Sequence, residues 1–479
     1  MREHHFAPGE VVARAVVSVV RRPRASLRRM SRRPIWQTLH DRFDPAQPVE
    51  NAVWRADRVR SPAVAISRAL DRPFGVPKVL FTGTIGTGKT TELLRIAGER
   101  ASKEFVVYLS LERHFQEVVG DPAALHNVSA WEVCFLAGVA LLRAARERLG
   151  FDLPEAHVKD LEDAWRAAAK AADATRAEPQ LDVAKLGKSM VLMASAGAAA
   201  IAGPAGVAAA TGLHVLEAVA DAGRWSLPFG IKKRALPDQD TQVQTLLACV
   251  NVLIGLIQQR GTRVLLIIDG LDRIQDFEKA RELFIESSMI GSLSCRLVLC
   301  GPYVLRYNGA INAVRGFSDV PPLVEEPVLD KADPTKPGPG VAFLRDVFAR
   351  RVADVRGPPL VGDRELGKLA YYSGGRAREF VTLIRAAVTR AWDADAERVD
   401  EAIVDDAIDE RRRRRETGLH VGHEKIMAAI AADPEHRLPA DPLAHDLVAY
   451  GAVLPYPDGS EWYYPHPLLM IRFVRKQAG

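Results

Sequence analysis

The chain has 479 residues, of which 48% are hydrophobic and 26% charged, and this composition is typical of a soluble globular protein with several domains. Its net charge of +5 is unevenly distributed, because residues 1–34 hold nine arginines and two glutamates. The basic total therefore does not indicate a nucleic-acid surface on the folded part. The four cysteines show neither C-x-x-C spacing nor metal spacing, which argues against a disulfide framework and favours the reducing cytoplasm.

Residues 1–33 combine a short apolar run at 11–20 with a cluster of arginines after it. This order is the reverse of a secretory signal. We interpret the segment as a basic, disordered arm, or as sequence that precedes a natural start at Met30, with a basic amphipathic anchor as the alternative. Residues 35–70 then show a helical pattern with Trp36, Leu39 and Phe43 on one face.

The next stretch carries the clearest chemistry of the chain. Residues 78–82 are an apolar run typical of a buried parallel strand, residues 83–90 spell G-x-x-x-x-G-K-T, and a helical pattern follows. The glycines let the backbone curl so that its N–H groups face an anion at a helix N-terminus. Lys89 is expected to reach the β- and γ-phosphates of a nucleoside triphosphate, and the Thr90 hydroxyl to hold Mg²⁺. The residues expected to contact the nucleotide are Gly83, Thr84, Ile85, Gly86, Thr87, Gly88, Lys89, Thr90 and Thr91.

A second strand is predicted at residues 104–111, with helices at 130–149 and 154–176. Residues 189–216 then form a 28-residue stretch of mostly Ala and Gly without a formal charge. A single membrane crossing would separate the two halves of the nucleotide site, and two crossings need about 40 residues. We therefore predict a helical hairpin bent near Gly203 and Pro204, buried in protein, with membrane contact as the alternative.

A third strand, residues 264–268, follows an amphipathic helix at 242–259 and ends in Asp269. The carboxyl end of a parallel strand faces the ligand crevice, so Asp269 is expected to hold Mg²⁺ opposite Thr90. Asp272, three residues on, is placed to orient or deprotonate the attacking water.

The remaining pattern predicts a strand at 295–301, a Pro-rich connection at 315–337 and helices at 340–355 and 363–392. Arg378 lies at a turn that opens a helix, where it either reaches the γ-phosphate or is a surface residue. The arginine run at 411–415 is interpreted as a solvated helix end and linker. From residue 421 the order is helix, helix and an Asp-Gly hairpin, as in a winged-helix domain, but the hairpin is acidic and aromatic, which favours packing or partner binding over DNA.

Taken together, these motifs resemble the AAA+/STAND class of P-loop ATPases. Residues 78–91 look like Walker A, the Asp-Gly-Leu-Asp at 269–272 looks like the Walker B of NACHT-type STAND proteins, and residues 373–379 look like the sensor 2 segment of origin-recognition ATPases. The resemblance implies that Arg378 contacts the nucleotide and that residues 35–70 lie beside the base. Cys300 and Gly301 stand where a polar sensor 1 residue is usual, so that role is unassigned.

The sequence thus predicts an α/β protein, a three-layer α/β/α P-loop NTPase core with a parallel sheet. We expect an arm at 1–33, a core at 34–325 with an insertion at about 150–235, a helical lid at 338–415 and a winged-helix-like domain at 416–479. The expected function is a cytoplasmic Mg²⁺-dependent ATPase that acts as a slow switch, with self-association or a protein partner. By resemblance, such a switch serves in bacterial stress or anti-phage defence. The alternatives are a DNA-associated ATPase of the origin-recognition type and a membrane-acting effector that uses residues 189–216.

Overall fold

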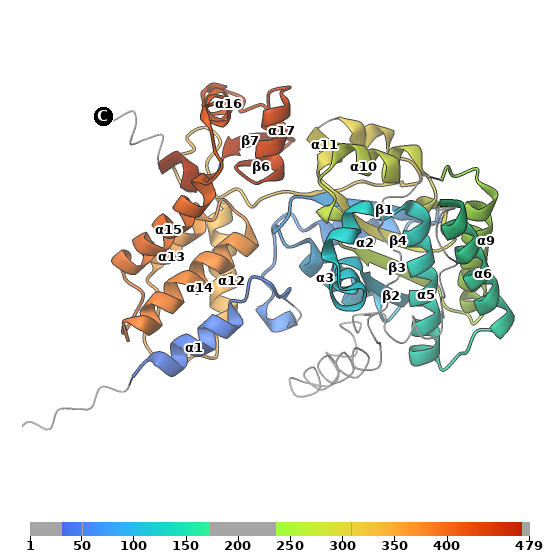
Figure 1. Cartoon of the computed structure of the whole chain (residues 1–479). Helices are drawn as coiled ribbons and strands as arrows, with labels where there is room; N and C mark the ends of the chain where they lie inside the picture. The colour runs from blue at the N-terminus through green and yellow to red at the C-terminus, as the bar shows by residue number, and fades with distance from the viewer. Residues whose placement is uncertain (1–30, 50, 173–235, 308, 472–479) are drawn as a thin grey trace, which may run out of the picture.

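A computed structural model describes residues 31–49, 51–172, 236–307 and 309–471. The arm at 1–30 and the apolar stretch at 189–216 lie outside the described residues, so the hairpin and membrane hypotheses stay predictions. In the described part, a core built on a parallel sheet stands beside a helical lid, and a small C-terminal unit sits next to both (Figure 1).

The core sheet has five parallel strands in the order β2-β3-β4-β1-β5. The strands are β1 (Lys78–Gly83), β2 (Phe105–Ser110), β3 (Val264–Asp269), β4 (Arg296–Pro302) and β5 (Pro322–Leu323). Four of them lie where the sequence predicts strands. The fifth strand, β5, lies within residues 315–337, for which the sequence predicted a connection without a strand. That prediction is wrong at β5, because a strand of two residues is too short to show a periodicity. The chain leaves β1 for the far edge and returns through β3 and β4, so a crevice opens at the carboxyl ends beside β1.

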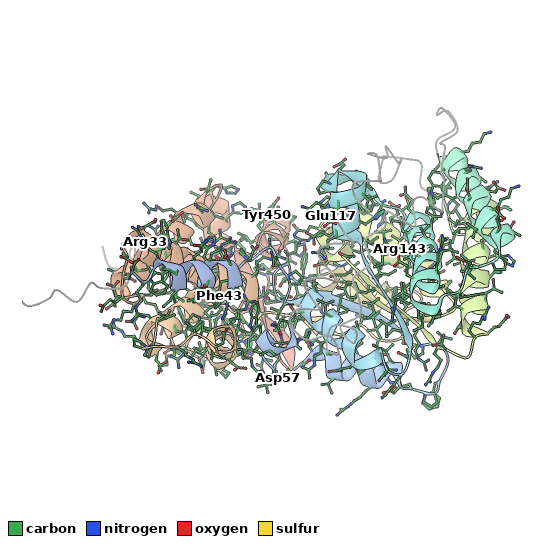
Figure 2. All side chains as sticks on the ribbon, turned by 90° about the horizontal axis from the view of Figure 1, so that it is seen from below. Arg33, Phe43, Asp57, Glu117, Arg143 and Tyr450 are labelled. Carbon is green, nitrogen blue, oxygen red and sulfur yellow. The ribbon has the colours of Figure 1, made fainter. Side chains whose placement is uncertain are left out.

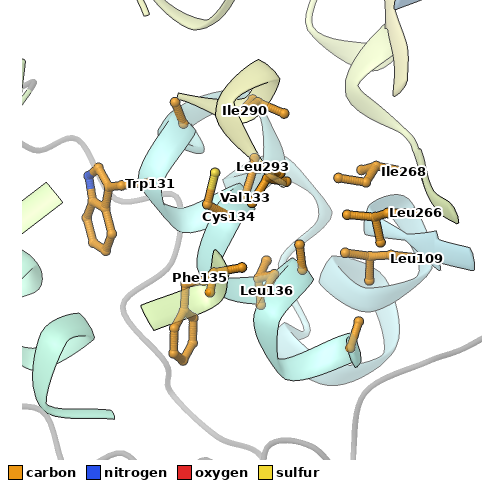
Figure 3. Packing of buried hydrophobic residues seen from close by; sticks show 14 of the residues in the cluster. Leu109, Trp131, Val133, Cys134, Phe135, Leu136, Leu266, Ile268, Ile290 and Leu293 are labelled. Carbon is orange, nitrogen blue, oxygen red and sulfur yellow. The ribbon is translucent and has the colours of Figure 1, made fainter. Parts of the chain in front are cut away.

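Helices cover both faces of the sheet, which gives the predicted three layers. Alternate residues of β1 face opposite sides, because Leu80 packs in one cluster while Val79 and Phe81 pack in the other. One face is covered by α2 (Pro62–Leu70) and α3 (Lys89–Arg100), and the other mainly by α5 (Ala130–Leu149), α9 (Thr241–Gln258) and α10 (Phe277–Arg281). Figure 3 shows side chains of α5 packed towards Leu109, Leu266 and Ile268 of the sheet.

The described part of the predicted insertion packs on the outer side of α5. There α6 (Glu155–Ala172) contacts α9, and both approach α5 at Gly138, where an added Cβ would lie 3.1 Å from Val250 and 3.3 Å from Leu161. Glycine at this position therefore lets three helices meet closely. Among the described helices, α9 is long and apolar enough by length and composition to cross a membrane.

The lid consists of α12 (Gly340–Val352), α13 (Asp363–Tyr372), α14 (Ala377–Asp393) and α15 (Glu401–Glu416), joined by α1 (Arg33–Arg42) from the other end of the chain. Trp36 is fully buried there and its indole N–H donates to the carbonyl of Ala396 at 2.9 Å. Figure 2 shows Phe43 at the end of α1 against the lid helices. The segment predicted as core, residues 34–325, thus begins with a helix that packs on the lid.

The arginine run was predicted as a solvated helix end and linker, and for two of its members this is wrong. Arg411 and Arg415 both bind the buried carboxylate of Glu379 on α14, at 2.5 Å and 2.6 Å. These contacts hold α15 against α14 inside the lid. The distinction could not be read from a run of like charges, because only the helix packing shows which of them face inward.

The C-terminal unit contains α16 (Val421–Ala432), α17 (Pro442–Ala449) and the antiparallel hairpin of β6 (Val453–Asp458) and β7 (Ser460–Pro465). The order of helix, helix and hairpin agrees with the sequence pattern. The unit contacts the core through Tyr303, whose hydroxyl donates to Glu461 at 2.9 Å. It contacts the lid through Tyr456, whose hydroxyl donates to the carbonyl of Gly374 at 3.0 Å.

Candidate nucleotide-binding site

The loop between β1 and α3 has the backbone curl that the sequence predicts. Gly86 and Gly88 adopt positive φ values of 92° and 102°, which side chains disfavour. At Gly83 an added Cβ would lie 2.3 Å from the carbonyl oxygen of Leu323, so β5 fixes the base of the loop. The first residues of α3, a helix of 12 residues, line the crevice, and the first N–H groups of a helix have no acceptor within the helix. This geometry suits an anion at the helix N-terminus.

Lys89 lies inside this loop and is only 4% exposed. Its ammonium donates to the carbonyl of Gly83 at 2.9 Å and forms an ion pair with Asp272, also at 2.9 Å. A buried ammonium with these partners is oriented into the curl of the loop rather than towards solvent. Lys89 and Asp272 therefore meet as two halves of one site, although 183 residues separate them in the sequence.

Asp269 stands at the carboxyl end of β3 and accepts two hydrogen bonds. Thr90 Oγ1 and the Tyr108 hydroxyl each donate to Asp269 Oδ2 at 2.8 Å. Burial, and secondarily the Asp272 carboxylate, raise the pKa of Asp269. Burial also acts to raise the pKa of Asp272, but the Lys89 charge and hydrogen bond outweigh it and the pKa is lowered. The two acids thus differ: Asp272 is held ionised by a lysine, and Asp269 is held by neutral hydroxyls.

The pair of Thr90 and Asp269 fits a magnesium ion by the chemistry of its donors. A hydroxyl and a carboxylate are the hard oxygen ligands that Mg²⁺ takes, with water and phosphate oxygens completing the shell. A divalent cation there would also offset the cost of burying the Asp269 charge. Cys300 on β4 lies beside this pair, and ligand atoms of Asp269, Asp272 and Cys300 lie within 4.8 Å of one another. The thiol occupies the position for which the sequence offered no polar residue.

The lid touches the phosphate loop directly. The backbone N–H of Arg378, at the start of α14, donates to the carbonyl of Gly86 at 3.0 Å. Burial and the nearby charge of Arg273 lower the pKa of Arg378, whose side chain lines the same cavity as Lys89. An arginine that lines the cavity beside a loop that binds anions is a suitable partner for a phosphate.

A second lid arginine reaches the loop through a carboxylate. Arg376 Nε and Thr84 Oγ1 both donate to Glu325 Oε1 at 2.8 Å. Glu325 is 1% exposed, so this bridge is shielded from solvent. It ties one turn of the phosphate loop to the segment that opens α14.

These elements enclose a cavity of about 350 Å³ between the core, the lid and residues 44–58. Its apolar wall includes Trp54 from the lead-in segment, Phe343 and Val347 from α12, and Val381 from α14. Arg58 closes one side, with its guanidinium 4.6 Å from the Phe343 ring centre and 3.3 Å from Glu92. Aromatic and aliphatic walls next to a phosphate loop suit a nucleobase.

The structure brings the predicted site residues together, but they form two groups: some line the cavity and others form the inner side of the loop. The cavity is lined by Ile85, Gly86, Gly88, Lys89, Thr90, Thr91, Asp269, Asp272 and Arg378. Gly83, Thr84 and Thr87 instead form the inner side of the loop, where the Thr87 hydroxyl donates to the carbonyl of Thr84 at 2.9 Å.

Sequence reasoning missed four residues that line or brace the site: Arg58, Tyr108, Glu112 and Glu325. Glu112 could have been found, because it follows a predicted strand at its carboxyl end. Arg58 lies within the predicted helical stretch at 35–70, where the pattern gave no signal that singles out this arginine.

No family model matches the chain, and no curated protein matches it. Among solved structures, the Aeropyrum pernix ORC1 protein in complex with DNA has a TM-score of 0.37 and 14% identity, covering 92% of this chain and 97% of that one. The ADP form of the Aeropyrum pernix ORC2 protein has a TM-score of 0.37 and 12% identity, covering 92% and 98%. Drosophila ORC bound to DNA has a TM-score of 0.33 and 11% identity, covering 98% and 96%.

Proposed function

We propose that this chain is an Mg²⁺-dependent ATPase whose nucleotide state sets the position of the lid. The observation that supports it most is the meeting of Lys89, Thr90 and Asp269 at one crevice, in the geometry that a triphosphate with its metal requires. The sequence contains no N-K-x-D with which to read guanine, so ATP is the proposed substrate. The resemblance to AAA+/STAND ATPases agrees with this proposal.

The expected slow turnover is attributed to the hydrogen bonds and ion pairs that the residues of the site already form with one another. Lys89 must give up its bond to the carbonyl of Gly83 to bind phosphate, and Thr90 must leave Asp269 to bind the metal. Each exchange costs a charge-assisted hydrogen bond before it gains another. Thr90 and Asp269 would hold Mg²⁺, which would supply positive charge to the phosphates, while Asp272 holds Lys89 or orients the water.

The switch role rests on the lid. Arg378 contacts the loop by its backbone and lines the cavity by its side chain, so a γ-phosphate changes the lid's partners. A cytoplasmic setting, self-association or a protein partner, and a role in stress or anti-phage defence extend this proposal by resemblance alone.

The test compares the wild-type protein with ATP, ADP and GTP, each with and without Mg²⁺. Equilibrium dialysis is expected to show ATP binding that Mg²⁺ strengthens and GTP does not displace. Limited proteolysis is expected to give different cleavage patterns with ATP and ADP in the connections between core and lid. Absence of ATP binding contradicts the proposal, and identical patterns with the two nucleotides contradict the switch.

A further inference from the structure

The cavity contains a carboxylate that the assignments above leave without a role. Glu112 belongs to α4 (Leu111–His114), the short helix that follows β2 directly, and its side chain lines the cavity beside Lys89 and Asp269. Strand β2 pairs with β3 so that Ser110 stands opposite Asp269. A Cβ on Gly270 would lie 2.8 Å from the backbone nitrogen of Glu112 and 3.4 Å from its Cβ. Glu112 therefore projects from the same edge of the sheet as the metal-binding acid.

The three carboxylates at this edge differ in how firmly the protein holds them. Asp269 accepts hydrogen bonds from Thr90 and Tyr108, and Asp272 is ion-paired with the buried Lys89. The Glu112 side chain is 44% exposed, whereas that of Asp272 is only 11% exposed. Its one ionic partner within the described residues is Arg273, at 2.5 Å. Glu112 thus has both a route to water and freedom to move.

The ion pair between Arg273 and Glu112 is expected to separate when a nucleotide binds. It follows Asp272 directly, lines the cavity and is 25% exposed. A guanidinium that faces an incoming triphosphate exchanges a carboxylate for phosphate oxygens, which it binds in the same planar geometry. That exchange releases Glu112 at the edge where water reaches the γ-phosphate.

We propose that Glu112 is the general base of the reaction and that Arg273 holds it idle until a triphosphate is bound. This proposal rests on the proposed function. The water oxygen forms a bond to the γ-phosphorus, the bond from that phosphorus to the β–γ bridging oxygen breaks, and the water proton passes to the Glu112 carboxylate. ADP and phosphate leave, and Glu112 returns its proton to solvent. Asp272 then keeps Lys89 in place and takes no proton.

The experiment measures ATP binding and single-turnover hydrolysis in Glu112→Gln, Glu112→Asp and Asp272→Asn. The matched control is Glu278→Gln, which alters an exposed glutamate paired with Arg281 at 2.6 Å outside the cavity. Removal of a general base lowers the rate by roughly 10²–10⁴-fold. We expect Glu112→Gln to bind ATP within about threefold of wild type and to lose about a hundredfold or more in rate, with Glu112→Asp partly active and the control unchanged.

The pH profile separates a base from a residue that only maintains structure. The acid limb of the single-turnover rate belongs to the base, so it is expected to disappear in Glu112→Gln and to persist in Asp272→Asn. Hydrolysis by Glu112→Gln at the wild-type rate overturns the proposal. So does loss of the acid limb in Asp272→Asn alone. A wild-type protein that binds ATP without hydrolysing it also overturns the base, while leaving nucleotide binding intact. A wild-type protein that fails to bind ATP contradicts the proposed function instead.

Discussion

The core and the lid each bury a cluster of opposite charges, and the two clusters are built for different purposes. In the core, Lys89 pairs with a single carboxylate, Asp272, at the wall of a cavity. In the lid, Glu379 receives two arginines, Arg411 and Arg415, and this cluster does not line the cavity. The core pair can exchange its partners for a ligand, while the lid cluster has closed on itself. Buried charge therefore marks a reactive site only where a cavity adjoins it.

The largest effect is expected from Lys89→Ala. Loss of the cation inside the loop weakens ATP binding by about a hundredfold, or roughly 3 kcal/mol, because a charge-assisted bond to phosphate disappears. Isothermal titration calorimetry measures this change. Lys103→Ala, on the exposed end of the α3–β2 connection, is the control and leaves the affinity unaltered. Wild-type affinity in Lys89→Ala contradicts the assignment of the phosphate loop.

Asp269→Ala tests the proposed metal site of the core. The variant lacks the carboxylate opposite Thr90, so we expect turnover to fall by about tenfold to a hundredfold and to lose its dependence on Mg²⁺. Phosphate release across a series of Mg²⁺ concentrations tests this. Tyr108→Phe removes only one hydrogen bond to the same carboxylate and should keep the Mg²⁺ dependence. A metal requirement that survives Asp269→Ala would place the ion elsewhere.

Glu379→Gln tests the closed cluster of the lid. The substitution leaves Arg411 and Arg415 without their counter-charge in a buried position, which costs about 3 kcal/mol and lowers the melting temperature by about 6 to 12 °C. Differential scanning calorimetry measures the shift. The matched change Glu397→Gln, at an exposed lid position, is expected to shift it little. Equal melting temperatures for Glu379→Gln and wild type would show that the cluster does not stabilise the lid.

The pH dependence of stability offers a smaller and independent test in the core. Burial lowers the pKa of His114 to about 4, and neither ring nitrogen has a hydrogen-bond partner among the described residues. In the unfolded chain His114 is protonated below about pH 6.5, whereas in the folded protein it stays neutral down to about pH 4. The free energy of unfolding therefore falls as the pH drops from about 6.5 towards 4. His114→Leu removes this penalty, and at pH 5 the difference amounts to about 2 kcal/mol. Urea titrations at pH 5 and pH 7.5 measure it, and parallel losses in both proteins would contradict it.

The smallest effect on binding is expected at the junction of the two regions. Arg378→Ala keeps the backbone contact to Gly86 and removes only the side chain, so ATP affinity should change by less than about tenfold. The difference between the proteolysis patterns with ATP and ADP should disappear, because the lid no longer detects the γ-phosphate. Retention of both patterns in Arg378→Ala assigns the sensing to another residue.

The sequence predicted what is local and missed what depends on tertiary contacts. Lys89 and Asp269 were found because a loop motif and a strand end each carry their chemistry within a few residues. Trp54 and Phe343 line the same cavity although they are 289 positions apart in the sequence, and no local pattern joins them. The arginine run shows the same limit, since its spacing could not reveal that two members bind Glu379.

The pairing of α1 with the lid has a consequence for how the protein is made. Ser31 Oγ donates to Asp395 at 2.9 Å across 364 positions of sequence. A ribosome that adds about 5–20 residues per second needs roughly 20 to 70 s to synthesise that interval. During this time Trp36, Leu39 and Phe43 have no partner helices, because α12 and α14 have not yet emerged. The apolar face of α1 therefore has no lid helix to pack against until those helices are synthesised, and its burial is a late step in the folding of the chain.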